Sequence, residues 1–171
     1  KSLFPVSPSP FIFPLFMKKL QNAFLFFATF ALLLSACNNT DQALLNTVRQ
    51  NASLLEKAVR DLKENSIVLG NLTNRLDGLP ENVKNHATGY SDLKEKANSI
   101  SNRIAVRTYE YDDLASQMHT LAEDYAAGKI KTQDLNSRLQ SFGTRISDAP
   151  GFVENVKKAL EEIKTGLQKF N

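Results

Sequence analysis

The chain has 171 residues, with 21 lysines and arginines against 18 aspartates and glutamates. Lys1, Lys18 and Lys19 are the only charged residues before position 37, so the rest of the chain is formally neutral. A neutral chain lacks the basic footprint of a nucleic-acid-binding protein, and we expect no nucleic-acid partner. One cysteine and two histidines exclude a disulfide framework and a Cys/His zinc site. The length allows one domain.

Residues 1–16 are interrupted by prolines and show no helical or strand period, and Met17 is the first methionine. Lys18 and Lys19 follow it, and then an uncharged apolar run of twelve residues, 23–34. This order is typical of a secretory signal peptide, and the run is too short to span a bilayer as a helix, which takes about 20 residues. We expect translation to start at Met17 and residues 1–16 to be an upstream segment; a genuine extended leader is the alternative.

The apolar run ends in Leu34-Ser35-Ala36-Cys37. This tetrapeptide resembles the lipobox of bacterial lipoproteins, an aliphatic residue, two small residues and a cysteine recognised by a dedicated signal peptidase. The resemblance covers residues 17–37 and implies that the Cys37 thiol receives a diacylglycerol and that the Ala36–Cys37 bond is cleaved. Buried acyl chains contribute roughly 0.8 kcal/mol per CH₂ group, so two or more give stable anchoring. The alternative is an ordinary signal peptide that leaves a free thiol.

The residue after Cys37 indicates the membrane in which a lipoprotein of this kind is expected to lie. In enterobacterial lipoproteins an aspartate there favours retention in the inner membrane, and Asn38 departs from that signal. The resemblance therefore implies a lipid-anchored protein of the cell envelope, in the outer membrane, although the rule differs between bacterial groups and leaves the face of the membrane open. On this interpretation residues 17–36 are the signal peptide, 37–40 the lipidated cysteine and its tether, and 41–171 the mature domain, for which we identify no family.

Apolar residues of the mature domain recur at steps of three and four, and no segment alternates with period two, so we expect it to be all-α. The first apolar stripe predicts a helix from about Asp41 to Leu76, ~54 Å long, ended by the turn at 77–80. A second row of this stripe weakens at Ser66 and Thr73, where we expect looser packing. The main row repeats every seven residues and comprises Val48, Leu55, Leu62, Leu69 and Leu76.

The second stripe predicts a helix from Glu81 to about Ala127, with Gly128 as a natural C-cap. Gly89 lies inside this helix, so a break or a frayed turn near 85–90 is an alternative. The row that repeats every seven residues comprises Val83, Tyr90, Ala97, Ile104, Tyr111, Met118 and Tyr125.

The third stripe follows Thr132, a favourable N-cap residue. Its apolar residues alternate steps of four and three without a miss, as in a heptad repeat. Pro150 lies in the middle, so either it kinks one helix or the chain stops near Ser147 and restarts with Pro150 in the first turn of a new helix. The stripe comprises Leu135, Leu139, Phe142, Ile146, Ala149, Val153, Val156, Leu160, Ile163, Leu167 and Phe170.

Two short connections predict that consecutive helices lie antiparallel. The expected fold is therefore an elongated antiparallel three-helix, coiled-coil-like bundle whose third helix is kinked or broken at Pro150. About 130 residues suffice to bury one core. The alternative is that the same stripes pair between chains as an oligomeric coiled coil.

Few residues offer chemistry. His119 has Glu123 one turn later, but Asp113 lies six residues earlier and not on the same face, so we interpret these groups as a solvated helix face. The chain has no Gly-rich phosphate loop and no GxSxG or HExxH motif. We expect no enzyme, no catalytic residue, no metal and no small-molecule substrate, and no cofactor beyond the acyl lipid on Cys37.

Arg107 and Tyr109 are the candidate partner contacts. Arg107 interrupts an apolar row, and we expect it either to pair with an acid from another helix or to lie at the edge of the stripe with its guanidinium in water. Tyr109 lies off the row that contains the other three tyrosines, so we expect it to be the exposed one.

These features favour a non-enzymatic structural or adaptor role, in which the domain holds a helical surface at a fixed distance from the membrane for a protein partner or for self-association. One alternative is a surface-exposed host-interaction lipoprotein. Another is a periplasmic binding module for a hydrophobic or peptide ligand, which predicts an apolar cavity near Ser66, Thr73 and Gly89.

Overall fold

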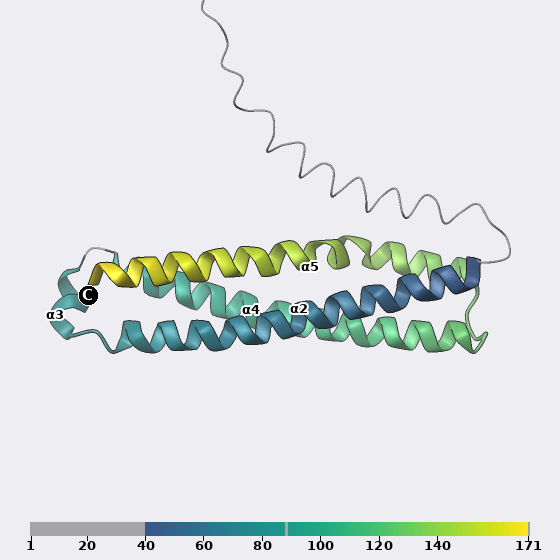
Figure 1. Cartoon of the computed structure of the whole chain (residues 1–171), viewed down its shortest axis with the longest axis horizontal. Coiled ribbons are helices and arrows are strands. Elements are labelled where there is room, and N and C mark those ends of the chain that lie inside the picture. Colours follow the sequence, from purple (N-terminus) through teal and green to yellow (C-terminus); the bar gives the residue numbers. More distant parts are fainter. Residues whose placement is uncertain (1–39, 88, 171) are drawn as a thin grey trace, which may run out of the picture. The chain divides into compact units, whose positions relative to one another are not determined.

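The structure, a computed structural model, describes residues 40–87 and 89–170. All regular structure in these residues is helical, which confirms an all-α fold for this part of the chain. From Leu45 onward the chain forms one compact unit. The elements are α2 (Thr40–Asp77), α3 (Glu81–His86), α4 (Tyr90–Ala126), α5 (Thr132–Leu167) and the 3-10 turn η2 (Gln168–Phe170) (Figure 1).

Helix α2 begins at Thr40, which we expected to be the last residue of the tether. Its predicted main row is buried throughout, with no member more than 3 % exposed. Ser66 is exposed and Thr73 is half-buried, so the second row does leave the core there. These two residues offer little apolar surface, and the core is filled instead from another row, three residues after the main one. That row comprises Ala58, Asn65 and Leu72.

The predicted second helix is two helices, α3 and α4, so the break near 85–90 is found and a single helix from Glu81 to Ala127 is not. Gly89 lies at the break with φ of +94°, in the left-handed region that glycine adopts without the strain of a Cβ atom. Gly128 follows α4 with φ of +70°, as expected for a residue that ends a helix.

Helix α5 is one continuous helix of 36 residues with Pro150 inside it. The alternative of a helix that stops near Ser147 is therefore wrong. Pro150 has no N–H to donate to the Ile146 carbonyl, so one backbone hydrogen bond of the helix is missing. Ala149 and Val153, on either side of it, are buried, and their packing stabilises the helix at this point. All eleven residues of the predicted stripe are buried except Phe142 and Phe170, which are half-buried.

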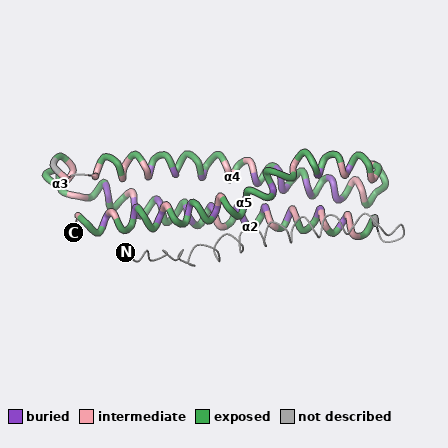
Figure 2. The backbone as a smooth tube through the Cα atoms, turned by 90° about the horizontal axis from the view of Figure 1, so that it is seen from above, coloured by how far each residue is buried: buried purple, intermediate pink, exposed green. Residues whose placement is uncertain are grey.

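Helices α4 and α5 run antiparallel. Lys96, near the start of α4, pairs with Glu162 near the end of α5. At the other end the hydroxyl oxygens of Tyr125 and Thr132 lie 3.0 Å apart. Buried residues recur at regular intervals along the long helices (Figure 2).

Helices α2 and α4 are also antiparallel. Asp77 at the end of α2 pairs with Lys94 near the start of α4, and Glu56 of α2 pairs with His119 in the second half of α4. These two side-chain pairs show the register of α2 against α4. No helix in the described part of the chain combines the length and the apolar character needed to cross a membrane.

Candidate functional site

The ring of Phe152 in α5 contacts the side chains of two arginines and a tyrosine of α4. The guanidinium carbons of Arg103 and Arg107 lie 5.4 and 5.7 Å from the centroid of the Phe152 ring. The Tyr111 ring meets it edge to face, with the centroids 6.4 Å apart. We refer to these four residues as the Phe152 cluster. Sequence reasoning missed Phe152 because it lies beside the apolar stripe, one residue before Val153, and only the packing of α5 on α4 brings it to the arginines.

Among residues 40–87 and 89–170, Arg107 pairs with an acid of its own helix and with none from another helix. Its Nη1 donates to Glu110 Oε2 at 2.7 Å, one turn later in α4. Both side chains remain partly exposed, so the pair adds little stability, about 0.2–0.5 kcal/mol. Arg107 thus matches the expectation of a residue at the edge of the stripe, with the face of Phe152 as an additional partner that the sequence did not indicate.

The four tyrosines divide as expected. Tyr111 is 1 % exposed, Tyr109 is 76 % exposed, and Tyr90 and Tyr125 are half-buried. Burial raises the pKa of the Tyr111 phenol above its ordinary value; Asp148 and Glu110 act in the same direction, and the Arg107 charge opposes them. Tyr109 therefore offers the accessible aromatic ring, while Tyr111 belongs to the core.

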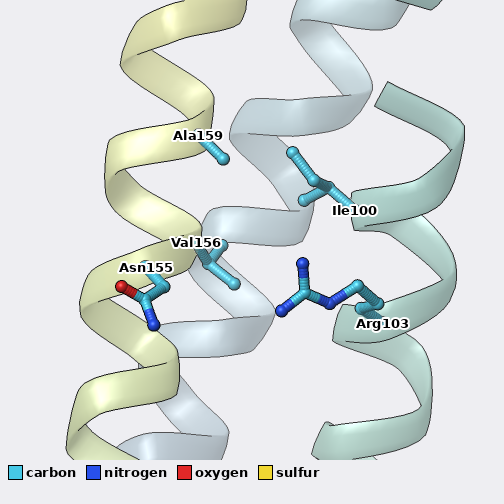
Figure 3. A pocket seen from close by; sticks show the side chains of 5 residues that line it. All are labelled: Ile100, Arg103, Asn155, Val156 and Ala159. Carbon is cyan, nitrogen blue, oxygen red and sulfur yellow. The ribbon is translucent and has the colours of Figure 1, made fainter. Parts of the chain in front are cut away.

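A hollow adjoins the Phe152 cluster between α4 and α5. It contains about 200 Å³ of empty space, open solvent included. Side chains of both helices line it: Ile100 and Arg103 of α4, and Asn155, Val156 and Ala159 of α5 (Figure 3). A second hollow, of about 410 Å³, lies where Arg138 and Phe142 meet α4. Neither is near Ser66, Thr73 or Gly89, where the ligand-binding alternative predicts a cavity.

His119 contacts α2 rather than the acids of its own helix. Its Nε2 lies 2.8 Å from Glu56 Oε1. Asp113 Oδ2 accepts a hydrogen bond from Gln117 Nε2 at 2.7 Å. Within residues 40–87 and 89–170, no three side chains of histidine, cysteine, aspartate or glutamate come together in a way that could hold a metal ion. His119 thus connects two helices.

Large apolar side chains are exposed at four positions of the described chain, Ile67 (67 %), Val68 (46 %), Val106 (56 %) and Tyr109 (76 %). A single exposed apolar residue is ordinary on a protein surface. These four are not scattered, because the register set by the two ion pairs places Ile67 of α2 level with Val106 of α4. The exposed apolar residues thus gather at one level of the helices.

Ala36 and Cys37, the residues of the expected cleavage and lipidation site, lie outside the described residues. No protein-family model matches the chain, and neither a curated protein nor a solved structure matches it. The cation–π contacts of Arg103 and Arg107 with Phe152 connect α4 to α5, and a pair of this kind contributes about 0.5–1 kcal/mol at an exposed site.

Proposed function

We propose that this chain is a lipid-anchored bacterial lipoprotein of the cell envelope, in the outer membrane, with a non-enzymatic spacer or adaptor role. The observation that carries the proposal is the sequence Leu34-Ser35-Ala36-Cys37 at the end of an uncharged apolar run. Helix α2 begins at Thr40, so only two residues separate Cys37 from the first helix. Such a short tether would hold the start of α2 at the membrane surface.

The fold that serves this role is an antiparallel three-helix, coiled-coil-like bundle, with α3 as a connection and α5 kinked at Pro150. The antiparallel pairs α2–α4 and α4–α5 support it, as does the hydrogen bond that Pro150 cannot make. The long helices have 38, 37 and 36 residues, each about 55 Å at the rise of an α-helix. Helices of that length are suited to holding a surface away from a membrane.

Arg107 and Tyr109 are the partner contacts in this proposal, on two different sides of α4, because residues two apart on a helix do not share a face. Tyr109 is largely exposed, and the Arg107 side chain is held in place by Glu110 and by the Phe152 ring. Tyrosine and arginine are enriched at protein interfaces because they combine a large contact area with polar groups.

The anchor is tested with Cys37→Ser in the full chain, expressed in a bacterial host fed an alkyne-labelled fatty acid. The unaltered chain is expected to carry the label and to sediment with membranes, and Cys37→Ser is expected to lose the label. Ser35→Ala keeps a small residue in the lipobox and serves as the control that retains labelling. An unlabelled native chain, or label that persists in Cys37→Ser, would refute the anchor.

The membrane assignment has a separate test in an enterobacterial host. Asn38→Asp introduces the residue that favours inner-membrane retention, so the protein is expected to move from the outer-membrane to the inner-membrane fraction of a density gradient. Asn39→Asp, one residue further from the cysteine, is the control. If Asn38→Asp leaves the distribution unchanged, Asn38 does not direct the protein to the outer membrane.

A further inference from the structure

Ile67 and Tyr109 belong to one face, formed by α2 and α4 together. Ile67 follows Glu56 by eleven residues, which is about three helical turns, so it lies on the same side of α2 as Glu56, whose carboxylate reaches His119 of α4. On α4, Ala105, Asp112 and His119 repeat every seven residues, and His119 contacts α2. Tyr109 lies next to this line, four residues after Ala105 and three before Asp112.

Ile67, Ala105 and Tyr109 form what we refer to as the apolar patch. All three are exposed. The two ion pairs between α2 and α4 place Ile67 level with the turn that contains Ala105, and place Tyr109 about one turn away. Val68, the residue after Ile67, lies 100° further around α2 and therefore outside this face.

The charges beside the patch have opposite signs on the two helices. On α2 the same face carries Arg49, Arg60 and Lys63, and on α4 it carries Asp112 and Glu123, all of them exposed. The other acids on this side of α2 are Glu56 and Asp77, which pair with His119 and Lys94 of α4. The register places Arg60 and Lys63 level with Asp112. Within the described chain, none of these three forms an ion pair, so their charges are available to another molecule.

A second copy of the chain can bind this face, because the acidic residues of its α4 can pair with the basic residues of α2. A rotation of 180° about an axis parallel to the helices brings α2 of one copy opposite α4 of the other at the same level. Arg60 and Lys63 then meet Asp112 of the other copy, and Ile67 meets Tyr109. Because the operation is two-fold, each contact is made twice.

We propose that the α2–α4 face is the interface of a parallel, two-fold symmetric homodimer, with the apolar patch at its centre and the charged strips beside it. An antiparallel copy, paired about the level of Ile67, would put Arg60 and Lys63 opposite Asn74 and Asn71 of the other copy, neither of which carries a charge. Complementary charges of this kind select the orientation and speed association. The tyrosine contributes the large, partly polar contact area of an interface centre.

The dimer goes beyond the proposed lipoprotein function and does not depend on it. The parallel arrangement brings the first turns of both α2 helices to the same end. Two anchors attached there would reach one membrane, whereas an antiparallel pair would separate them by about the length of a helix.

The orientation is tested by photo-cross-linking of the full chain. Tyr109 is replaced by benzoylphenylalanine, and chains labelled with ¹⁴N and ¹⁵N are mixed before irradiation. We expect a covalent dimer in which mixed-isotope peptides join position 109 to the part of α2 around Ile67. The absence of mixed-isotope cross-links, or mixed-isotope cross-links that lead to α5, would overturn the proposal.

The contacts are tested by sedimentation equilibrium of the full chain in detergent. Ile67→Asp is expected to weaken dimerisation about tenfold or more, since two charges enter one interface. Val68→Asp is the matched control, one residue away on another side of α2, and is expected to leave dimerisation unchanged. A monomeric native chain, or equal effects of the two variants, would overturn the proposal.

Charge reversal distinguishes a variant that has lost the dimer interface from one that has lost its fold. Asp112→Lys is expected to weaken dimerisation, and adding Arg60→Glu and Lys63→Glu to it is expected to restore dimerisation by exchanging the two strips. Circular dichroism checks that each variant keeps its helix content. A triple variant that remains as monomeric as Asp112→Lys would show that the strips do not face one another.

Discussion

Two buried polar atoms of the described residues, one in α2 and one in α4, have no hydrogen-bond partner. Asn65 of α2 is 9 % exposed and its Nδ2 has no hydrogen-bond partner, and the buried Thr108 hydroxyl of α4 has none either. The ion pairs between α2 and α4 place the two residues at the same level. A buried polar group without a partner costs about 1–3 kcal/mol, so this level is a local weakness.

Replacing Asn65 with an apolar residue of similar volume should remove that cost. We expect Asn65→Leu to raise the free energy of unfolding by about 1–2 kcal/mol in urea denaturation. Asn71→Leu, at an exposed position of the same helix, is the control and should change it by less than about 0.5 kcal/mol. A lower stability of Asn65→Leu would contradict the assignment of an unpartnered amide.

Gly166 of α5 lies against a side chain of α4. A Cβ atom there would come within 2.7 Å of both Cδ atoms of Leu93, whereas one at Gly143, in the same helix, would meet nothing within 4 Å. We expect Gly143→Ala to raise the free energy of unfolding by about 0.5–1 kcal/mol, because alanine favours the helix. Gly166→Ala should gain less or lose stability, because Leu93 must move.

A double-mutant cycle isolates the Leu93 contact. In a Leu93→Ala background, Gly166→Ala should recover the gain seen at Gly143, and chemical denaturation measures the difference. Equal gains for Gly143→Ala and Gly166→Ala in the native background would contradict the close approach.

Tyr111 makes stability depend on pH in the alkaline range. Burial raises its folded-state pKa above the unfolded value of about 10, so its contribution to stability is complete below pH 10 and is lost as pH rises through the folded-state pKa. We expect the free energy of unfolding to fall above pH 10 and this slope to decrease in Tyr111→Phe, which keeps the ring against Phe152. Tyr109→Phe, at an exposed position, is the control; the same reduction in slope there would contradict the assignment to Tyr111.

At the scale of the element, Pro150 is the feature of α5 with the largest expected effect. Its side chain is exposed, so replacing it removes no buried contact, and alanine restores the hydrogen bond to the Ile146 carbonyl. We expect Pro150→Ala to raise the free energy of unfolding by about 1–3 kcal/mol, measured by circular dichroism in urea. Ser147→Ala, exposed one turn earlier, is the control. No gain in Pro150→Ala would mean that the proline suits the curvature of this helix.

At the scale of the whole molecule, charge offers a test of processing. The chain as written has an isoelectric point near 9.0 and a net charge of +3. Lys1, Lys18 and Lys19 account for that excess, so a chain cleaved before Cys37 is formally neutral. We expect the protein recovered from membranes to focus near neutral pH and the Cys37→Ser precursor to remain basic. A membrane-bound protein that focuses near pH 9 would contradict cleavage at Cys37.

The long helices were predictable from the sequence because helical periodicity is a local property. Residues three and four apart share a face wherever they lie in the fold, so the row from Val48 to Leu76 and the stripe from Leu135 to Leu167 identified buried residues before any packing was known. The exposure of Tyr109 followed from the same reasoning, because this residue lies off the row. The break at Gly89 was only the alternative to one helix from Glu81 to Ala127, suggested by the cost of glycine inside a helix.

Other features required the packing of one helix on another. Whether α5 continues through Pro150 depends on the contacts that hold Ala149 and Val153 in the core, and local preference alone left both outcomes open. The partners Phe152 for Arg107 and Glu56 for His119 come from other helices, far along the chain. By itself the sequence determined which residues form helices and which sides of them are apolar, because these depend on neighbours in the chain. The tertiary structure decided the register and the partners, because these depend on which helices lie side by side.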